Sequence, residues 1–168
     1  WVMPRLAKGK GQAIEALSEQ QEAPVVIAGF GRYGQIVARV LMANGIRTSV
    51  LDHDAERIES ARAFGYRVFY GDATRLDLLR LAGAAQARAV VVAVDDVDDA
   101  NSIVDTVKTH FAQAQLVVRV RDLTHAFDML DRGVTSFDRE LFDASMRSAR
   151  RVLDAMGVDA QDAHRMVQ

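Results

Sequence analysis

The chain of 168 residues is 49% hydrophobic and 26% charged, which is ordinary for a globular protein and suits one domain with appendages. A formal net charge of −2 provides no basic surface with which to hold nucleic acid through its phosphates. The chain has no cysteine, which excludes disulfides, thiolate metal sites and cysteine nucleophiles and fits a reducing compartment. No apolar run approaches the ~20 residues that a membrane-spanning helix needs.

Residues 1–23 look like a linker, because they combine basic residues, two glycines and a stretch rich in Glu and Gln, and Pro24 ends them. Trp1 followed by a basic cluster is typical of a cytoplasmic exit from a bilayer. It is equally compatible with a boundary inside an ordinary linker, and the sequence leaves both interpretations open.

Residues 25–28 are an apolar run that leads into Gly-x-Gly-x-x-Gly at 29–34, and apolar residues at helical spacing follow. A buried strand, a glycine turn and a helix are the context of the dinucleotide-binding fingerprint. Gly29 permits the tight turn, Gly31 lets a phosphate approach the backbone, and Gly34 lets the helix pack closely on the strand. The helix N-terminus adds N–H groups and a partial positive charge that suit an anion.

Asp52 ends the next apolar run and follows Gly31 by 21 residues, close to the ~20 expected for the acid that binds a ribose. A carboxylate here can accept hydrogen bonds from both hydroxyls of an adenosine ribose, and it repels a 2′-phosphate. The motif therefore predicts a site for AMP or NAD(H), without deciding between them. The alternative is a glycine-rich turn that binds no ligand.

Strand and helix alternate through the rest of the chain, which predicts the fold class α/β, a Rossmann-like doubly wound parallel sheet with strand order 3-2-1-4-5 and a long C-terminal helix. The predicted organisation is a linker at 1–23, a Rossmann-like domain at 24–137, and a C-terminal helix and tail at 138–168. The further strands are expected at residues 48–51, 67–70, 89–94 and 116–120, with a short sixth near Val134.

The helices have recognisable starts. Asp54 is a good N-cap for a helix that carries Ile58, Ala61 and Phe64 and stops at Gly65. Thr74, with Asp77 three residues later, predicts a capping-box start for the next helix. A later helix carries Ala126, Phe127, Met129 and Leu130 and stops at Gly133.

The C-terminal helix, expected from Asp138 to Met156, has a wide apolar stripe that includes Phe142 and Met146, and Gly157 ends it. Such a stripe can pack on the chain's own sheet. Its near-heptad spacing equally suits a seam between two subunits. Both interpretations remain open.

Ligands of such sheets bind at the carboxyl ends of the strands. Asp72 with the N–H of Ala73 can read an adenine edge there, although Asp72 can also be a simple turn residue. The acidic run Asp95–Asp99 can bind a divalent cation, but such runs more often cap a helix, and we predict no metal site. The side chains expected at this edge are Arg32, Asp52, His53, Asp72, Thr74, Asp95, Asp96, Arg121 and Asp122.

No catalytic apparatus accompanies this site. The four histidines are scattered, and none pairs with a plausible nucleophile or a second metal ligand. A hydride-transfer enzyme needs a second region to hold its substrate over the nicotinamide. Arg32 places a guanidinium beside the phosphate cradle, where it can pair with the nucleotide, with a second anion or with a neighbouring acid.

Several motifs, in order, resemble the regulatory RCK/KTN (TrkA-N) domains of bacterial Kef-type potassium efflux systems. They are GFGRYGQ at 29–35, LDHD at 51–54, FYGDAT at 69–74, AGA at 82–84, VDD at 94–96 and RVRD at 119–122. The resemblance runs from about Pro24 to about Leu153 and loosens after Asp122.

The resemblance implies a nucleotide site in the Rossmann cleft that takes AMP or NAD(H). Asp52 would hold the ribose, and Asp72 with Ala73 would read adenine. Arg32, and less strongly Arg121, would contact glutathione as an effector. The nucleotide-binding residues expected are Gly29, Phe30, Gly31, Arg32, Tyr33, Gly34, Gln35, Asp52, His53, Asp72, Ala73, Thr74 and Asp95.

The resemblance further implies a non-enzymatic cytosolic domain that dimerises and gates an attached potassium/proton antiporter. The site would face the cytoplasm at the inner membrane, and Trp1 to Lys10 would be the exit from the last membrane helix. An ancillary quinone oxidoreductase subunit is a further implied partner. The alternatives are a nucleotide-binding fragment of an NAD-dependent oxidoreductase and a redox-sensing Rossmann protein that acts through a protein partner.

Overall fold

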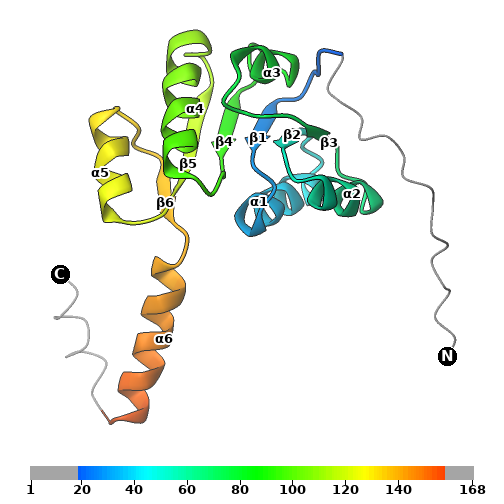
Figure 1. The fold of residues 1–168 in the computed structure, drawn as a ribbon. Coiled ribbons are helices and arrows are strands. Elements are labelled where there is room, and N and C mark those ends of the chain that lie inside the picture. The colour runs from blue at the N-terminus through cyan, green and yellow to red at the C-terminus, as the bar shows by residue number, and fades with distance from the viewer. Residues whose placement is uncertain (1–18, 158–168) are drawn as a thin grey trace, which may run out of the picture.

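In the computed structural model, which describes residues 19–157, six parallel strands form one sheet in the order β3-β2-β1-β4-β5-β6 (Figure 1). The strands are β1 (Val25–Ala28), β2 (Thr48–Asp52), β3 (Val68–Tyr70), β4 (Ala89–Val92), β5 (Gln115–Val120) and β6 (Phe137–Arg139). The helices are α1 (Arg32–Ala43), α2 (Ala55–Ala63), α3 (Leu76–Leu81), α4 (Val97–His110), α5 (Leu123–Asp131) and α6 (Phe142–Ala155). The predicted fold class and strand order are confirmed. The expected membrane exit and the end of the tail lie outside the described residues.

The core has two layers, one on each face of the sheet. On one face, α1 and α2 pack on the sheet through Ala38 and Ile58. On the other face, α3, α4 and α5 do so through Leu79, Ile103 and Met129. The central strand β1 is buried along its whole length, because helices cover both of its faces.

The short sixth strand that was expected near Val134 is present as β6, from Phe137 to Arg139. Val134 is not in the sheet, because its N–H donates to the carbonyl of Met129 and closes the C-terminal turn of α5, with Gly133 at φ 72°. Phe137 then pairs with Val118 of β5, and the strand ends at Arg139.

The predicted start of the C-terminal helix at Asp138 is also wrong, because Asp138 lies in β6, paired with β5. The helix α6 begins at Phe142 and is followed by Gly157 at φ 73°, as expected. No residue of α6 is buried, and the helix projects away from the sheet (Figure 1). Its apolar stripe therefore does not pack on the chain's own core.

Other apolar side chains also face outward. Phe64 is 77% exposed because it follows α2 as its C-cap instead of lying on the inner face. Phe127 is exposed on α5 together with Leu123 and Leu130, while Ala126 and Met129 face the core. None of the described helices is long and apolar enough to cross a membrane.

Candidate nucleotide-binding site

The glycine turn after β1 has the tight geometry that the fingerprint requires. Gly29 adopts φ 97°, and a Cβ there would lie 2.8 Å from the backbone of Ala93 and Val94. A Cβ at Gly34 would clash with the carbonyl group of Gly29, so α1 packs directly on the turn. A Cβ at Gly31 meets only the Arg57 guanidinium, at 3.8 Å. The backbone of Gly31 is thus the accessible part of the turn.

Asp52 is tied to this turn by its carboxylate. The side chain is only 3% exposed. Its Oδ2 accepts the N–H of Phe30 at 2.6 Å, and its Oδ1 accepts the N–H of Asp54 at 2.7 Å. Backbone N–H donors compensate the buried charge and fix the carboxylate at the carboxyl end of β2.

A cavity of about 520 Å³ opens where the strands end, beside Asp52. It brings together seven of the residues expected to bind the nucleotide, and the acidic residues Asp96, Asp98 and Asp99 also line it. The seven are Gly29, Asp52, His53, Asp72, Ala73, Thr74 and Asp95. A cavity at the switch between β1 and β4 is where open α/β sheets bind ligands.

Asp72 forms a turn of its own at the end of β3. Its Oδ1 accepts the hydroxyl of Thr74 at 2.7 Å and the N–H of Thr74 at 2.9 Å. These bonds, the hydroxyl first, lower the pKa of Asp72. Thr74 is therefore engaged by Asp72 and is not the N-cap of α3. That position belongs to Arg75, and the capping-box prediction is wrong.

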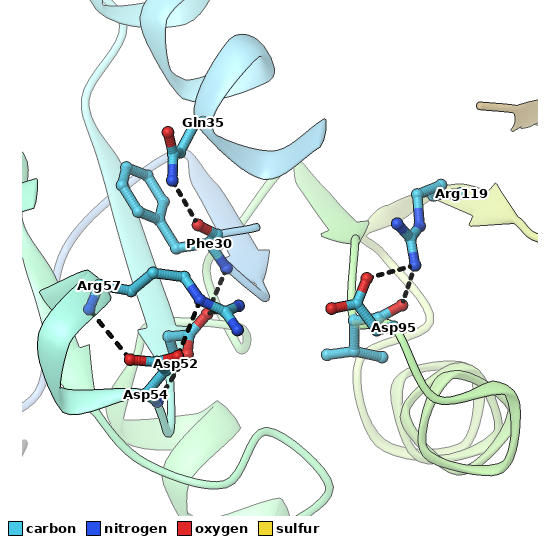
Figure 2. A network of polar contacts seen from close by, with 8 residues as sticks. Phe30, Gln35, Asp52, Asp54, Arg57, Asp95 and Arg119 are labelled. Carbon is cyan, nitrogen blue, oxygen red and sulfur yellow. Dashed lines mark hydrogen bonds and ion pairs between the residues drawn. The ribbon is translucent and has the colours of Figure 1, made fainter. Parts of the chain in front are cut away.

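Two residues of the acidic run after β4, Asp95 and Asp96, have different roles. Asp96 caps α4 by accepting the N–H of Asp99 at 3.0 Å, which is the commoner use of such a run. Asp95 pairs with Arg119 at 2.9 Å (Figure 2). In the part of the chain that the structure describes, no group of three or more His, Asp or Glu side chains is arranged to hold a metal ion.

Sequence reasoning missed Arg119, which is 90% buried and links three segments. Its guanidinium donates to the carbonyl of Val94 at 2.9 Å, to Asp95, and to Glu140 at 2.7 Å. The partners lie 21 to 25 residues away in the sequence, so no local spacing indicates them. Arg119 thus connects the wall of the cavity to the residues just before α6.

The remaining predicted residues lie outside the cavity lining. The Gln35 amide donates to the carbonyl of Phe30 at 3.0 Å and supports the turn. The Tyr33 hydroxyl donates to Asp138 at 3.5 Å, and burial, followed by Asp138, raises the pKa of Tyr33. Arg32 is exposed at the first position of α1, and Arg121 is exposed after β5. Arg32 and Arg121, the two residues predicted to contact glutathione, are therefore not brought together in the lining of this cavity.

A second hollow, the α1–α2 groove, adjoins this site. It has a volume of about 710 Å³. Its floor includes Phe30 and Tyr66, whose rings meet edge to face at 5.3 Å. Arg39, the exposed ring of Phe64 and Arg57 form part of its walls, and Arg57 also lines the nucleotide cavity.

The parallel sheet, the glycine turn and the acid at the end of β2 define a Rossmann-type nucleotide-binding fold. The chain belongs to the TrkA-N domain family, which matches residues 25–137. The glutathione-regulated potassium-efflux system protein KefC of Salmonella arizonae is 42% identical over 161 residues, which are 96% of this chain and 26% of KefC. KefC of Salmonella typhi matches to the same extent. The chain thus spans about a quarter of the length of these relatives.

Solved structures support the same family and fold. The Shewanella denitrificans Kef C-terminal domain in its AMP-bound form is 42% identical, with a TM-score of 0.74 over 84% of this chain and 86% of that one. The TrkA-N domain of the inner membrane protein ybaL from Escherichia coli is 19% identical, with a TM-score of 0.67 over 80% of this chain and 97% of that one. At that identity the second likeness shows the fold alone.

Proposed function

We propose that this chain is the regulatory domain of a Kef-type potassium efflux protein and that it binds AMP or NAD(H) without catalysing a reaction. The observation that carries the proposal is the cavity in which Gly29, Asp52 and Asp72 come together at the strand ends. The likeness to a Kef C-terminal domain in an AMP-bound form supports the same ligand class.

The charges around Asp52 should let the site distinguish a ribose with a free 2′-hydroxyl from one that carries a 2′-phosphate. Asp52 and Asp54 carry two negative charges, and Arg57 carries one positive charge between them. The balance is negative and repels a 2′-phosphate. Titration calorimetry on the purified chain should therefore detect binding of AMP or NADH and much weaker binding of NADPH. The absence of heat with every adenine nucleotide would remove the proposed function.

The attached protein is proposed to be a membrane potassium/proton antiporter with this domain on the cytoplasmic face of the inner membrane. The relatives named as potassium-efflux proteins are about four times as long as this chain, which leaves room for such a partner domain. A quinone oxidoreductase subunit is proposed as an ancillary partner. Potassium efflux from cells that carry the full-length protein, compared with its Asp52→Ala variant, tests whether the nucleotide site regulates transport.

Glutathione or an adduct is proposed as the effector, bound in the α1–α2 groove. The groove offers the guanidinium groups of Arg39 and Arg57 for carboxylates and the exposed ring of Phe64 for an apolar adduct. Arg32 and Arg121 do not line this groove. They remain proposed contacts to the same anion, reached across the interface between two subunits. Because α6 leaves its stripe unburied, we also propose a homodimer through α6.

A further inference from the structure

Arg57 lies between the glycine turn and the ribose acid. It comes from the first turn of α2, and its side chain folds over the end of β2 (Figure 2). Its Nη1 is 3.3 Å from Oδ2 of Asp52, and its Nε is 3.1 Å from Oδ2 of Asp54. The same Nη1 is the atom that a Cβ at Gly31 would meet. Two carboxylates therefore hold the guanidinium in the place where a nucleotide would lie.

The hydrogen bonds of Asp52 leave little room for a ribose. An ionised carboxylate offers about four acceptor positions. The N–H of Phe30, the N–H of Asp54 and Nη1 of Arg57 occupy three of them. On Oδ2, the N–H of Phe30 and Arg57 use both lone pairs. A ribose that donates two hydroxyl hydrogen bonds needs two free acceptor positions, and with these three donors in place the carboxylate offers one.

The N–H bonds of Phe30 and Asp54 belong to the fold of the turn and of the β2–α2 loop, so they stay when a ligand enters. Arg57 is different, because its guanidinium sits on a long side chain that is 36% exposed. It also lines the α1–α2 groove, so it can leave Asp52 without entering the core. Arg57 is the one donor of the three that can be exchanged.

We propose that Arg57 competes with the ribose for Asp52 and thereby sets how strongly the site distinguishes a ribose from a sugar that lacks its hydroxyls. This inference rests on the proposed nucleotide site. In the unmodified chain, the loss of the contact between Arg57 and Asp52 offsets part of the free energy gained from the hydrogen bonds of the ribose. Without the guanidinium, both hydroxyls would find free acceptors.

The test compares AMP with 2′,3′-dideoxy-AMP by calorimetry on the unmodified chain and on its Arg57→Met variant. Loss of the guanidinium weakens the attraction for the 5′-phosphate equally for both ligands, so that effect cancels in their affinity ratio. The ratio should rise about tenfold or more in Arg57→Met, since a hydrogen bond to a carboxylate is restored. Arg80→Met, an exposed change on α3 that lies in neither cavity wall, should leave the ratio unchanged.

A ratio that stays the same or falls in Arg57→Met overturns the competition, because Arg57 would then be neutral toward the ribose or would help to hold it. Arg57→Gln, which keeps a polar group without the charge, should also raise the ratio, and failure in both variants excludes a folding artefact of one. If the unmodified chain binds neither nucleotide, the proposed function fails and this inference fails with it. That outcome differs from retained AMP binding with an unchanged ratio.

Discussion

Asp52 concentrates the recognition expected of this site in one side chain. The buried carboxylate is held by two backbone N–H groups and faces the cavity. Replacement by Ala removes the acceptor for the ribose and should weaken AMP binding by about 1.5–3 kcal/mol, the range for a hydrogen bond to a charged group. Calorimetry on Asp52→Ala measures the difference. An unchanged affinity would mean that the ribose makes no use of this acid.

His125 is a buried histidine whose titration should be visible in the stability of the fold. It is 3% exposed, its Nδ1 accepts the N–H of Arg121, and its Nε2 has no partner among the described residues. Burial lowers the pKa of His125, with Arg119 and Arg132 acting in the same direction and Asp122 and Asp128 opposing them.

The sign of the effect follows from that direction. Because the folded chain holds the proton of His125 less tightly than the unfolded chain, acid favours unfolding. The contribution of neutral His125 should be complete above the unfolded pKa of ~6.5 and should be lost as the pH falls below it. Urea unfolding at pH 7.5 and pH 5.5 measures this. The drop in free energy of unfolding should be smaller in His125→Gln than in the unmodified chain, and equal drops would exclude the role.

The side chains that sequence reasoning missed, Arg119 and Arg57, both contact residues that only the folded sheet brings near them. Arg119 finds its partners only when the ends of β4, β5 and β6 meet, so no spacing in the sequence indicates them. Arg57 gave a weak local signal, since it stands three residues after the N-cap Asp54. That spacing predicts the pair with Asp54. It does not reveal the reach to Asp52, which depends on how α2 leaves the sheet.

At the scale of elements, the strands were predictable because parallel strands buried on both faces are continuous apolar runs bounded by polar turns. The errors fall where two local rules compete. Thr74 is a residue type that often caps a helix, but here the carboxylate of Asp72 accepts hydrogen bonds from its hydroxyl and its N–H. Residues 137–139 have the sequence of a helix start, but pairing with β5 gives them a strand.

The helix α6 carries the prediction about association. None of the residues of its stripe, which includes Phe142, Met146 and Leu153, is buried within the described chain, so a second copy is the proposed cover. Replacing Phe142 and Met146 by Glu should convert dimers to monomers in light scattering. Replacing Arg147 and Arg151 by Glu changes two exposed residues at the same spacing on the face opposite the stripe and should leave dimers. A monomeric unmodified chain at tens of micromolar would contradict the seam.

At the scale of the molecule, polar contacts connect the nucleotide cavity to α6. Asp95 lines the cavity and forms an ion pair with Arg119. The same guanidinium binds Glu140, two residues before α6 begins. The hydroxyl of Tyr33, in the first turn of α1, donates to Asp138 of β6. A ligand that draws Asp95 or the turn toward itself therefore acts on the segment that orients α6. This is a physical route by which ligand binding could reach the proposed dimer interface.

An effector can shift a gate only if it binds one state of the protein more tightly than the other. Glutathione in the α1–α2 groove would meet that condition if groups of both subunits complete its site. Arg39→Ala and Arg32→Ala should each weaken glutathione binding, measured by calorimetry, while AMP affinity changes much less because the glycine turn and Asp52 remain. Arg80→Ala should change neither. If Arg32→Ala abolishes AMP binding and the unmodified chain never binds glutathione, Arg32 is a phosphate ligand, and the domain senses the nucleotide without a thiol input.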